Sequence, residues 1–211
     1  MVETAQLRQR LGRDVFDYQQ LVSCLSHLSK PRDKINRLLN RGDVVRIRKG
    51  LYVFGPAYRR DSLARELLAN LIYGPSYISL EYALSYWGLI PERVSTVTSV
   101  ALGRSRKFDT PLGAFTYRSL SPASYAVGAD LVESPVGNFL IACAEKALAD
   151  KVWTDKRFTG TRLSDFPAYI EEDLRIDLTR LVDRDRSRCE RIQRAYGSKK
   201  TGNLFRFLDS L

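Results

Sequence analysis

The sequence has little histidine and cysteine, and this scarcity limits the chemistry available to it. His27 is the only histidine among 211 residues. Ser-His-Asp and Cys-His nucleophile systems need a histidine base, and most zinc sites use histidine or clustered cysteine. The three cysteines, Cys24, Cys143 and Cys189, are scattered without paired spacing, which indicates a reducing compartment rather than a disulfide framework. We expect no enzyme activity, no metal and no cofactor.

Other signals are also missing. No charged segment followed by an apolar stretch opens the chain, and its longest apolar runs are far shorter than a bilayer span. There is no Gly-x-x-x-x-Gly-Lys phosphate loop and no nuclease-type Glu-x-Lys pair. We therefore expect a cytoplasmic protein that does not bind membranes.

Positive charge is plentiful and unevenly distributed. Lys and Arg outnumber Asp and Glu by 34 to 24, which gives a net charge of +10 and favours a polyanionic partner. Residues 1–57 hold 11 basic and 5 acidic residues. Most of the excess charge therefore lies in the first quarter of the chain.

Residues 17–54 carry the pattern of a DNA-binding module. Asp17 with Gln20 three residues later is an N-cap signature, and apolar residues follow at helical spacing. Pro31 fits only the first turn of a second helix, predicted over residues 30–41, and Gly42 suits its left-handed end. Apolar, β-rich sequence then flanks the hairpin tip Arg48-Lys49-Gly50. Helix, turn, helix and basic hairpin is the order of a winged helix-turn-helix.

The helix predicted over residues 30–41 has one apolar and one polar face. At about 100° per residue, Leu38 and Leu39 fall within about 60° of Ile35. Arg can hold guanine O6 and N7 together, Asn can pair with adenine, and Lys reaches phosphates. Arg37 and Asn36 are the predicted base contacts. The full set of expected DNA-contact residues on this helix is Lys30, Arg32, Lys34, Asn36, Arg37, Asn40 and Arg41.

The hairpin adds three further predicted DNA contacts, Arg46, Arg48 and Lys49. A wing of this kind lies along the sugar-phosphate backbone or enters the minor groove. Since side chains alternate along a strand, Arg46 and Arg48 are expected to share a face. A solvated helix and hairpin without a DNA partner is the alternative interpretation.

The remainder of the chain predicts a mixture of helices and short strands. Asp61 is the expected cap of a helix through Ile72, and Ser79 that of a second helix ending near Trp87. The segments predicted as strands are Val94–Leu102, Ala114–Ser119 and the stretches around Tyr125 and Leu131. Helix is predicted again over Leu140–Trp153, Phe166–Asp173 and from Asp177 to Tyr196.

These elements predict an α+β protein with an N-terminal winged helix-turn-helix, a mixed α/β companion domain and a helical C-terminal segment. The expected boundaries are 1–57 for the DNA-binding domain, 58–155 for the companion domain and 156–211 for the helical segment packed on it. No internal repeat is visible.

Three groups of residues outside the first module each allow two interpretations. Gly103–Phe108 is a basic loop, either a second contact site or a solvated turn. Tyr82, Tyr86 and Trp87 form either a base-stacking platform or part of the core. The apolar C-terminal stretch Leu204–Leu208 docks either on its own chain or on a partner. Glu145 and Asp150 lie too far round one helix to act as an acid–base pair, so a structural bond is expected for Glu145.

The order of several short motifs resembles the antitoxin family of type IV abortive-infection toxin–antitoxin systems, the AbiE type. The motifs are Arg46–Tyr52, Tyr77–Leu84 with Gly88-Leu89, and Glu145–Asp150, and the resemblance covers about residues 17–153. It implies a winged helix that represses its own operon at repeated operator half-sites. It also implies a companion domain that counters a nucleotidyltransferase-like toxin. The DNA-contact role would fall on Lys30–Arg41 and Arg46–Lys49, and no catalytic residue carries over.

The sequence-based prediction is therefore a DNA-binding transcriptional repressor and antitoxin, with double-stranded operator DNA and a nucleotidyltransferase-like toxin as partners. The alternative is a protein-interaction module whose winged helix serves for docking and has no operator specificity.

Overall fold

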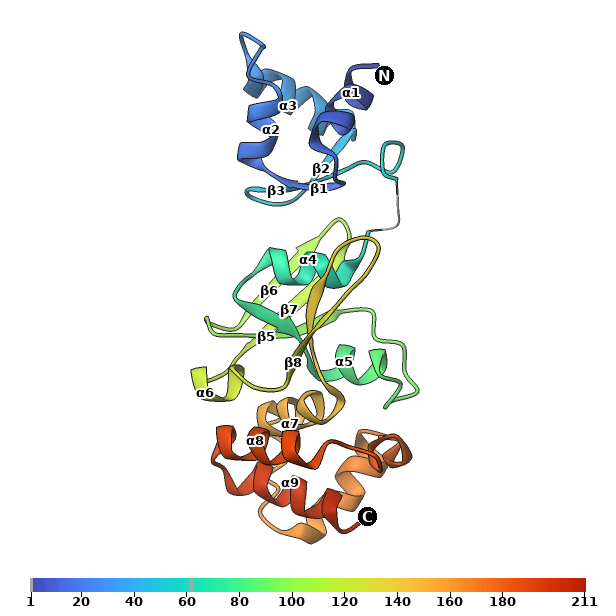
Figure 1. The fold of residues 1–211 in the computed structure, drawn as a ribbon, viewed down its shortest axis with the longest axis vertical. Helices are drawn as coiled ribbons and strands as arrows, with labels where there is room; N and C mark the ends of the chain where they lie inside the picture. The colour runs from blue at the N-terminus through green and yellow to red at the C-terminus, as the bar shows by residue number, and fades with distance from the viewer. Residues whose placement is uncertain (1, 61–62) are drawn as a thin grey trace.

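The computed structural model describes residues 2–60 and 63–211 and shows a mixed α+β protein, as predicted. An N-terminal module of three helices and a small sheet lies at one end of an elongated molecule (Figure 1). Its strands pair antiparallel in the order β1-β3-β2. The elements of this module are α1 (Val2–Leu11), β1 (Val15–Asp17), α2 (Tyr18–Cys24), α3 (Pro31–Asn40), β2 (Val44–Arg48) and β3 (Leu51–Phe54).

The signals that predicted these helices have the expected local structure. Asp17 and Gln20 form a reciprocal capping box at the start of α2. Pro31 is the first residue of α3, where a missing N–H costs nothing. Gly42 follows the helix with φ +73°, the left-handed conformation that favours glycine. Strand β1, by contrast, was not predicted.

The module's small sheet is apolar on both faces. Phe16, Tyr52 and Phe54 pack with the three helices in the module's own core. Leu51 and Val53, on the opposite face, belong to the apolar cluster that fills the rest of the chain. The N-terminal module therefore packs on the remainder of the protein through the second face of its sheet.

The remainder of the chain is built on a mixed sheet of six strands in the order β6-β7-β5-β4-β9-β8. β5 with β7 and β4 with β9 run parallel, and the other neighbours run antiparallel. The strands are β4 (Ser76–Ile78), β5 (Val97–Ala101), β6 (Arg106–Thr110), β7 (Gly113–Ser119), β8 (Ala129–Val132) and β9 (Phe139–Ala142). The helices are α4 (Arg65–Ile72), α5 (Leu80–Tyr86), α6 (Pro122–Tyr125) and α7 (Ala144–Thr154).

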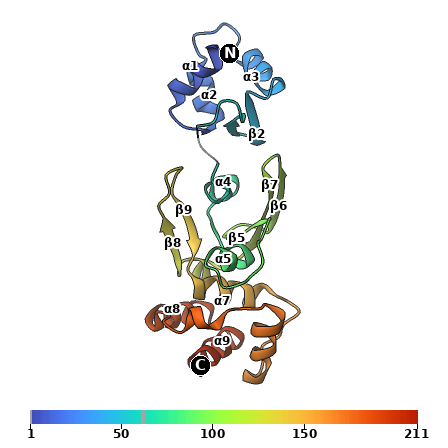
Figure 2. The ribbon, with the colours of Figure 1, turned by 90° about the vertical axis from the view of Figure 1, so that its right-hand side faces the viewer.

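Helices cover both faces of this sheet. α4 lies on one face between the two outer hairpins (Figure 2), where the Tyr117 hydroxyl donates to the Ala69 carbonyl over 2.6 Å. α5 and α7 lie on the other face, where the Tyr77 hydroxyl donates to Asp150 over 3.2 Å. Alternate residues of the central strands are therefore buried against different helices.

Several sequence-based predictions for this region are wrong in detail. The stretch around Tyr125 is a short helix, α6, and not a strand. Strands β4, β6 and β9 were not predicted as such, and the helix predicted from Leu140 begins after Cys143 because β9 occupies the preceding residues. α4 begins at Arg65 with Ala64 as its N-cap residue. The predicted cap Asp61 lies outside the described residues.

The C-terminal segment forms the end of the molecule opposite the N-terminal module (Figure 1). The long helix predicted from Asp177 is two elements, because Asp185 caps a new helix. α8 and α9 pack against α7, and the apolar C-terminal stretch docks on its own chain, with Leu204, Phe205 and Leu208 buried. The elements are η1 (Leu163–Asp165), η2 (Ala168–Asp173), η3 (Leu178–Leu181), α8 (Arg186–Tyr196) and α9 (Lys199–Asp209).

Candidate nucleic-acid interface

The polar face of α3 is exposed, as its periodicity predicts. Ile35 and Leu38 are buried in the module's core and Leu39 packs against it. Five of the predicted DNA-contact residues are exposed, one just before α3 and four within it. In the described part of the chain, their side chains form no hydrogen bond or ion pair. These residues are Lys30, Arg32, Asn36, Arg37 and Asn40. Asp33 is exposed in the same arc and places one negative charge among them.

Two other predicted contacts on α3 differ from these five. Lys34 is half-buried. Arg41 is engaged with Asp43, to which its Nε donates over 3.0 Å and its Nη2 also donates, and with the Thr4 hydroxyl. Burial alone would raise the pKa of Asp43, but the bonds from Arg41 and Thr4 outweigh it and leave this pKa below its ordinary value. Arg41 therefore ties the end of α3 to β2 and α1.

The hairpin does not place Arg46 and Arg48 on one face, contrary to the prediction from strand alternation. Arg46 pairs with Tyr52 across the strands, whereas Arg48 pairs with Leu51, because a β-bulge lies between them. Neighbouring residues of β3 face opposite sides, so Arg46 and Arg48 do not share a face. Arg48 lies on the side of the rest of the chain, where its charge acts to lower the pKa of the Tyr117 hydroxyl against the larger effect of burial. All three side chains are exposed, and Arg48 differs from Arg46 only in the face of the sheet on which it lies.

The structure adds Tyr18 to this surface. Its backbone N–H donates to the Gly50 carbonyl at the hairpin tip over 3.2 Å, and its side chain is 37% exposed. Tyr18 also borders a hollow shared with Lys30 and Arg32 at the start of α3. The sequence gives no sign of this position, because Tyr18 follows the N-cap and its neighbourhood depends on the hairpin folding back.

A buried polar network links two of the motifs on which the family resemblance rests. Lys146 and Asp150 are both fully buried on α7, and Lys146 Nζ lies 2.7 Å from Asp150 Oδ1. The other Asp150 oxygen accepts from the Ser79 and Tyr77 hydroxyls over 2.6 and 3.2 Å. Tyr196 donates to Asp150 and accepts from Lys146. The third Lys146 N–H bonds the carbonyl of Ser124 over 2.8 Å.

Burial sets the protonation behaviour around this network. It lowers the pKa of Lys146, against the opposing effect of Asp150, and it raises the pKa of Tyr77 and Tyr196. Gly128, at φ +81°, makes the close approach possible, because a Cβ there would lie 2.9 Å from Lys146 Cβ. Every N–H of Lys146 is satisfied, so the network acts as a structural centre that joins α7 to β4 and α8.

Trp87, the loop after Gly103 and Cys143 have contacts or positions that are structural. Tyr86 packs edge-on against Trp87, whose indole N–H donates to the Ala142 carbonyl over 2.7 Å. The second half of the basic loop after Gly103 is the start of β6. Burial raises the pKa of Cys143 to about 12, with the nearby charge of Glu145 adding to the effect. This thiol is therefore inert at neutral pH.

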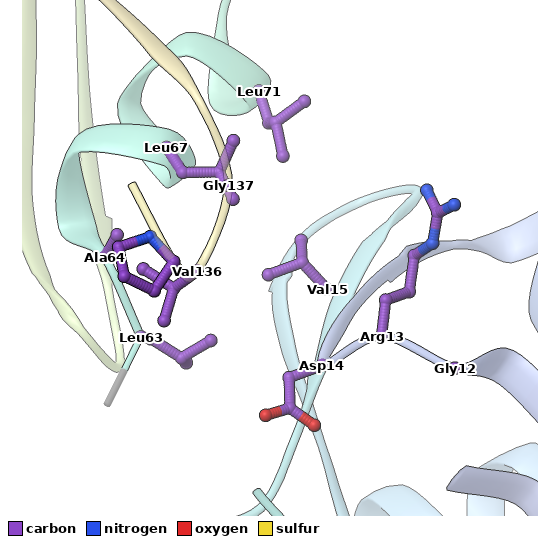
Figure 3. Close-up of a pocket in the computed structure, with 11 residues that line it drawn as sticks. Gly12, Arg13, Asp14, Val15, Leu63, Ala64, Leu67, Leu71, Val136 and Gly137 are labelled. Atoms are coloured by element: carbon purple, nitrogen blue, oxygen red, sulfur yellow. The ribbon is translucent and has the colours of Figure 1, made fainter. Parts of the chain in front are cut away.

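A cavity of about 530 Å³ separates the N-terminal module from α4. Leu63, Leu67 and Leu71 line one side and Val15 the other, while Arg13 points away from the apolar side chains (Figure 3). The cavity thus lies between two packed parts of the chain, and its lining combines these apolar side chains with polar groups of residues 12–14.

The chain matches no protein-family profile and no curated protein. Among residues 2–60 and 63–211, no group of three or more His, Cys, Asp and Glu side chains is placed to hold a metal ion. Within the same residues, no helix has the length and apolar character needed to cross a membrane.

Proposed function

We propose that residues 1–57 form a winged helix-turn-helix and that the protein is a sequence-specific DNA-binding repressor. The observation that carries this proposal is the exposed face of α3, where Arg32, Asn36, Arg37 and Asn40 form no side-chain hydrogen bond or ion pair in the described structure. Free Arg and Asn side chains on an exposed helix supply the donors and acceptors that read base edges in the major groove. α3 is the recognition helix and β2–β3 the wing.

Under this proposal the basic residues have different roles. Arg37 and Asn36 contact base edges, while Lys30, Arg32, Lys49 and the Tyr18 hydroxyl contact phosphates. Arg41 supports the helix from behind, through Asp43. Arg48 faces the remainder of the protein, so Arg46 and Lys49 are the wing residues that contact DNA in this proposal.

We further propose that the chain is the antitoxin of a type IV system. The support is the motif order, together with the way Tyr77 and Ser79 of one motif meet Lys146 and Asp150 of another in one network. These residues hold the fold, so the surface that counters a nucleotidyltransferase-like toxin lies elsewhere. Co-purification with the product of the neighbouring gene tests this part. Complex formation without operator preference would favour the alternative of a docking module.

A mobility-shift assay with the upstream region of the protein's own gene, at near-physiological salt, tests DNA recognition. Arg37→Ala should lose about 1–3 kcal/mol of preference for the operator over random DNA. Lys49→Ala should weaken binding to both DNAs alike and reduce the salt slope by about 1. Arg194→Ala, an exposed arginine of α8, is the control and should change nothing. Equal binding of the wild type to operator and random DNA would refute the proposal.

A further inference from the structure

A second, polar cavity lies far from α3, on the α5 and α7 side of the large sheet. Its volume is about 600 Å³, and it is lined by Thr98 and Thr116 of the sheet, Glu81 of α5 and the C-terminal end of α7. This volume falls in the range of about 300–1,000 Å³ typical of small-molecule sites. Its lining differs from most such sites because it is largely charged and hydroxylic.

The charges around this cavity divide into a paired and an unpaired set. Lys151 Nζ donates to Glu81 over 2.8 Å and lies 3.6 Å from Asp155. Asp155 also accepts from the Arg157 guanidinium over 3.2 and 3.3 Å. Hydrogen bonds from Arg157, opposed by burial, hold the pKa of Asp155 below its ordinary range. Both acidic groups are thus paired with basic side chains of the same structure.

Two cations remain. Arg118 of β7 and Lys156, two residues beyond the end of α7, line the cavity, and in the described structure neither side chain has a hydrogen bond or ion pair. The Thr116 hydroxyl beside Arg118 likewise has no hydrogen-bond partner among the described residues. Two unpaired positive charges and one hydroxyl in a concave site suit a compact dianion. None of the described residues that line the cavity is aromatic, so no ring is offered for stacking a base.

We propose that this cavity binds a small phosphorylated ligand, a phosphate ester or pyrophosphate, through Arg118, Lys156 and the Thr116 hydroxyl. Arg118 supplies a planar two-donor contact to the phosphate oxygens and Lys156 a point charge. The site is separate from α3 and does not depend on the proposed DNA-binding function. A concave site fits a small anion better than the convex backbone of a duplex.

Isothermal titration of the full chain with pyrophosphate, at about 150 mM salt, tests the proposal. The wild type should bind saturably at one site. Arg118→Gln and Lys156→Gln should each weaken binding at least about ten-fold, the loss expected for one charge-assisted hydrogen bond. Arg194→Gln removes an equal charge from a residue of α8 outside the cavity and should leave binding unchanged. Circular dichroism verifies that each variant is folded.

Absence of saturable binding by the wild type would overturn the proposal. So would binding that survives both cavity substitutions, or that Arg194→Gln weakens equally. A parallel mobility-shift assay with duplex DNA distinguishes a small phosphorylated ligand from the phosphates of a DNA backbone. If Arg118→Gln and Lys156→Gln weaken duplex binding while pyrophosphate fails to bind, these cations serve the DNA backbone and the small-ligand site is refuted. Arg37→Ala should still bind pyrophosphate, so failure of the DNA proposal does not affect this one.

Discussion

Breaking the buried Lys146–Asp150 pair should destabilise the protein strongly. Both side chains are 0% exposed, so water cannot solvate the charge that a single substitution leaves behind. Asp150→Asn or Lys146→Met should each cost about 3–5 kcal/mol. That is a large fraction of the stability of about 5–15 kcal/mol typical of folded proteins. At about 2–4 °C per kcal/mol for a chain of this size, each Tm should fall by roughly 6–20 °C.

The double variant Lys146→Met/Asp150→Asn tests whether the two residues act together. It should cost less than the sum of the single variants by about 1–3 kcal/mol, because it leaves no unpaired charge. Urea unfolding followed by tryptophan fluorescence is the assay. Trp87 and Trp153 are the protein's two tryptophans, and both lie outside the N-terminal module, so the signal reports the part that contains the network.

Lys107→Met is the matched control for this cycle. Lys107 pairs with Asp109 over 3.2 Å, but the two side chains are 63% and 72% exposed, so its loss should cost no more than about 0.5 kcal/mol. Losses below about 1 kcal/mol in both single network variants, at unchanged m-value, would refute the reasoning. Strict additivity in the double variant would do the same.

Two further predictions concern acid stability and a close backbone contact. Hydrogen bonds from Arg157 lower the pKa of Asp155 in the folded state against the effect of burial. The carboxylate therefore contributes stability that is complete above about pH 4 and is lost as the pH falls toward the folded-state value. Asp155→Asn should be less stable at pH 7 with a flatter acid-unfolding profile, whereas Asp109→Asn should follow the wild type. Gly55→Ala should destabilise the N-terminal module by about 1–3 kcal/mol or more, since a Cβ there would lie 1.9 Å from the Gly42 carbonyl oxygen. Hydrogen exchange of module amides measures this loss, and native protection would contradict it.

The N-terminal module was the most predictable part of the chain. Its signals act over a few residues: the Asp17 capping box, Pro31 at a first turn and Gly42 at a helix end. The face of α3 follows from the 3.6-residue period alone. The bulge in β2 does not, because it depends on the register with β3, and it turns Arg48 away from the expected face.

The large sheet and its buried network were much less predictable. β4 has three residues and β9 four, too few to show an alternating pattern, and the two pair with each other although they lie far apart in the sequence. Lys146 and Asp150 occupy neighbouring turns of one helix, but Tyr77, Ser79 and Tyr196 reach them from 46 to 73 residues away. On this helix Asp150 contacts Lys146 and not Glu145.

The second apolar face of the module's sheet determines how α3 is presented. Rotating the module away from the large sheet would expose Ile47, Leu51 and Val53 to water. Full exposure of each such side chain costs about 1.5–3 kcal/mol of free energy. The angle between α3 and the body is therefore fixed by packing and not by the length of the connecting chain. Under the proposed DNA-binding function, two copies on one operator would hold their α3 helices at a separation set by the packing of the module on the rest of the chain. Substitutions of Ile47, Leu51 or Val53 should then change the preferred spacing of half-sites without altering a proposed DNA contact.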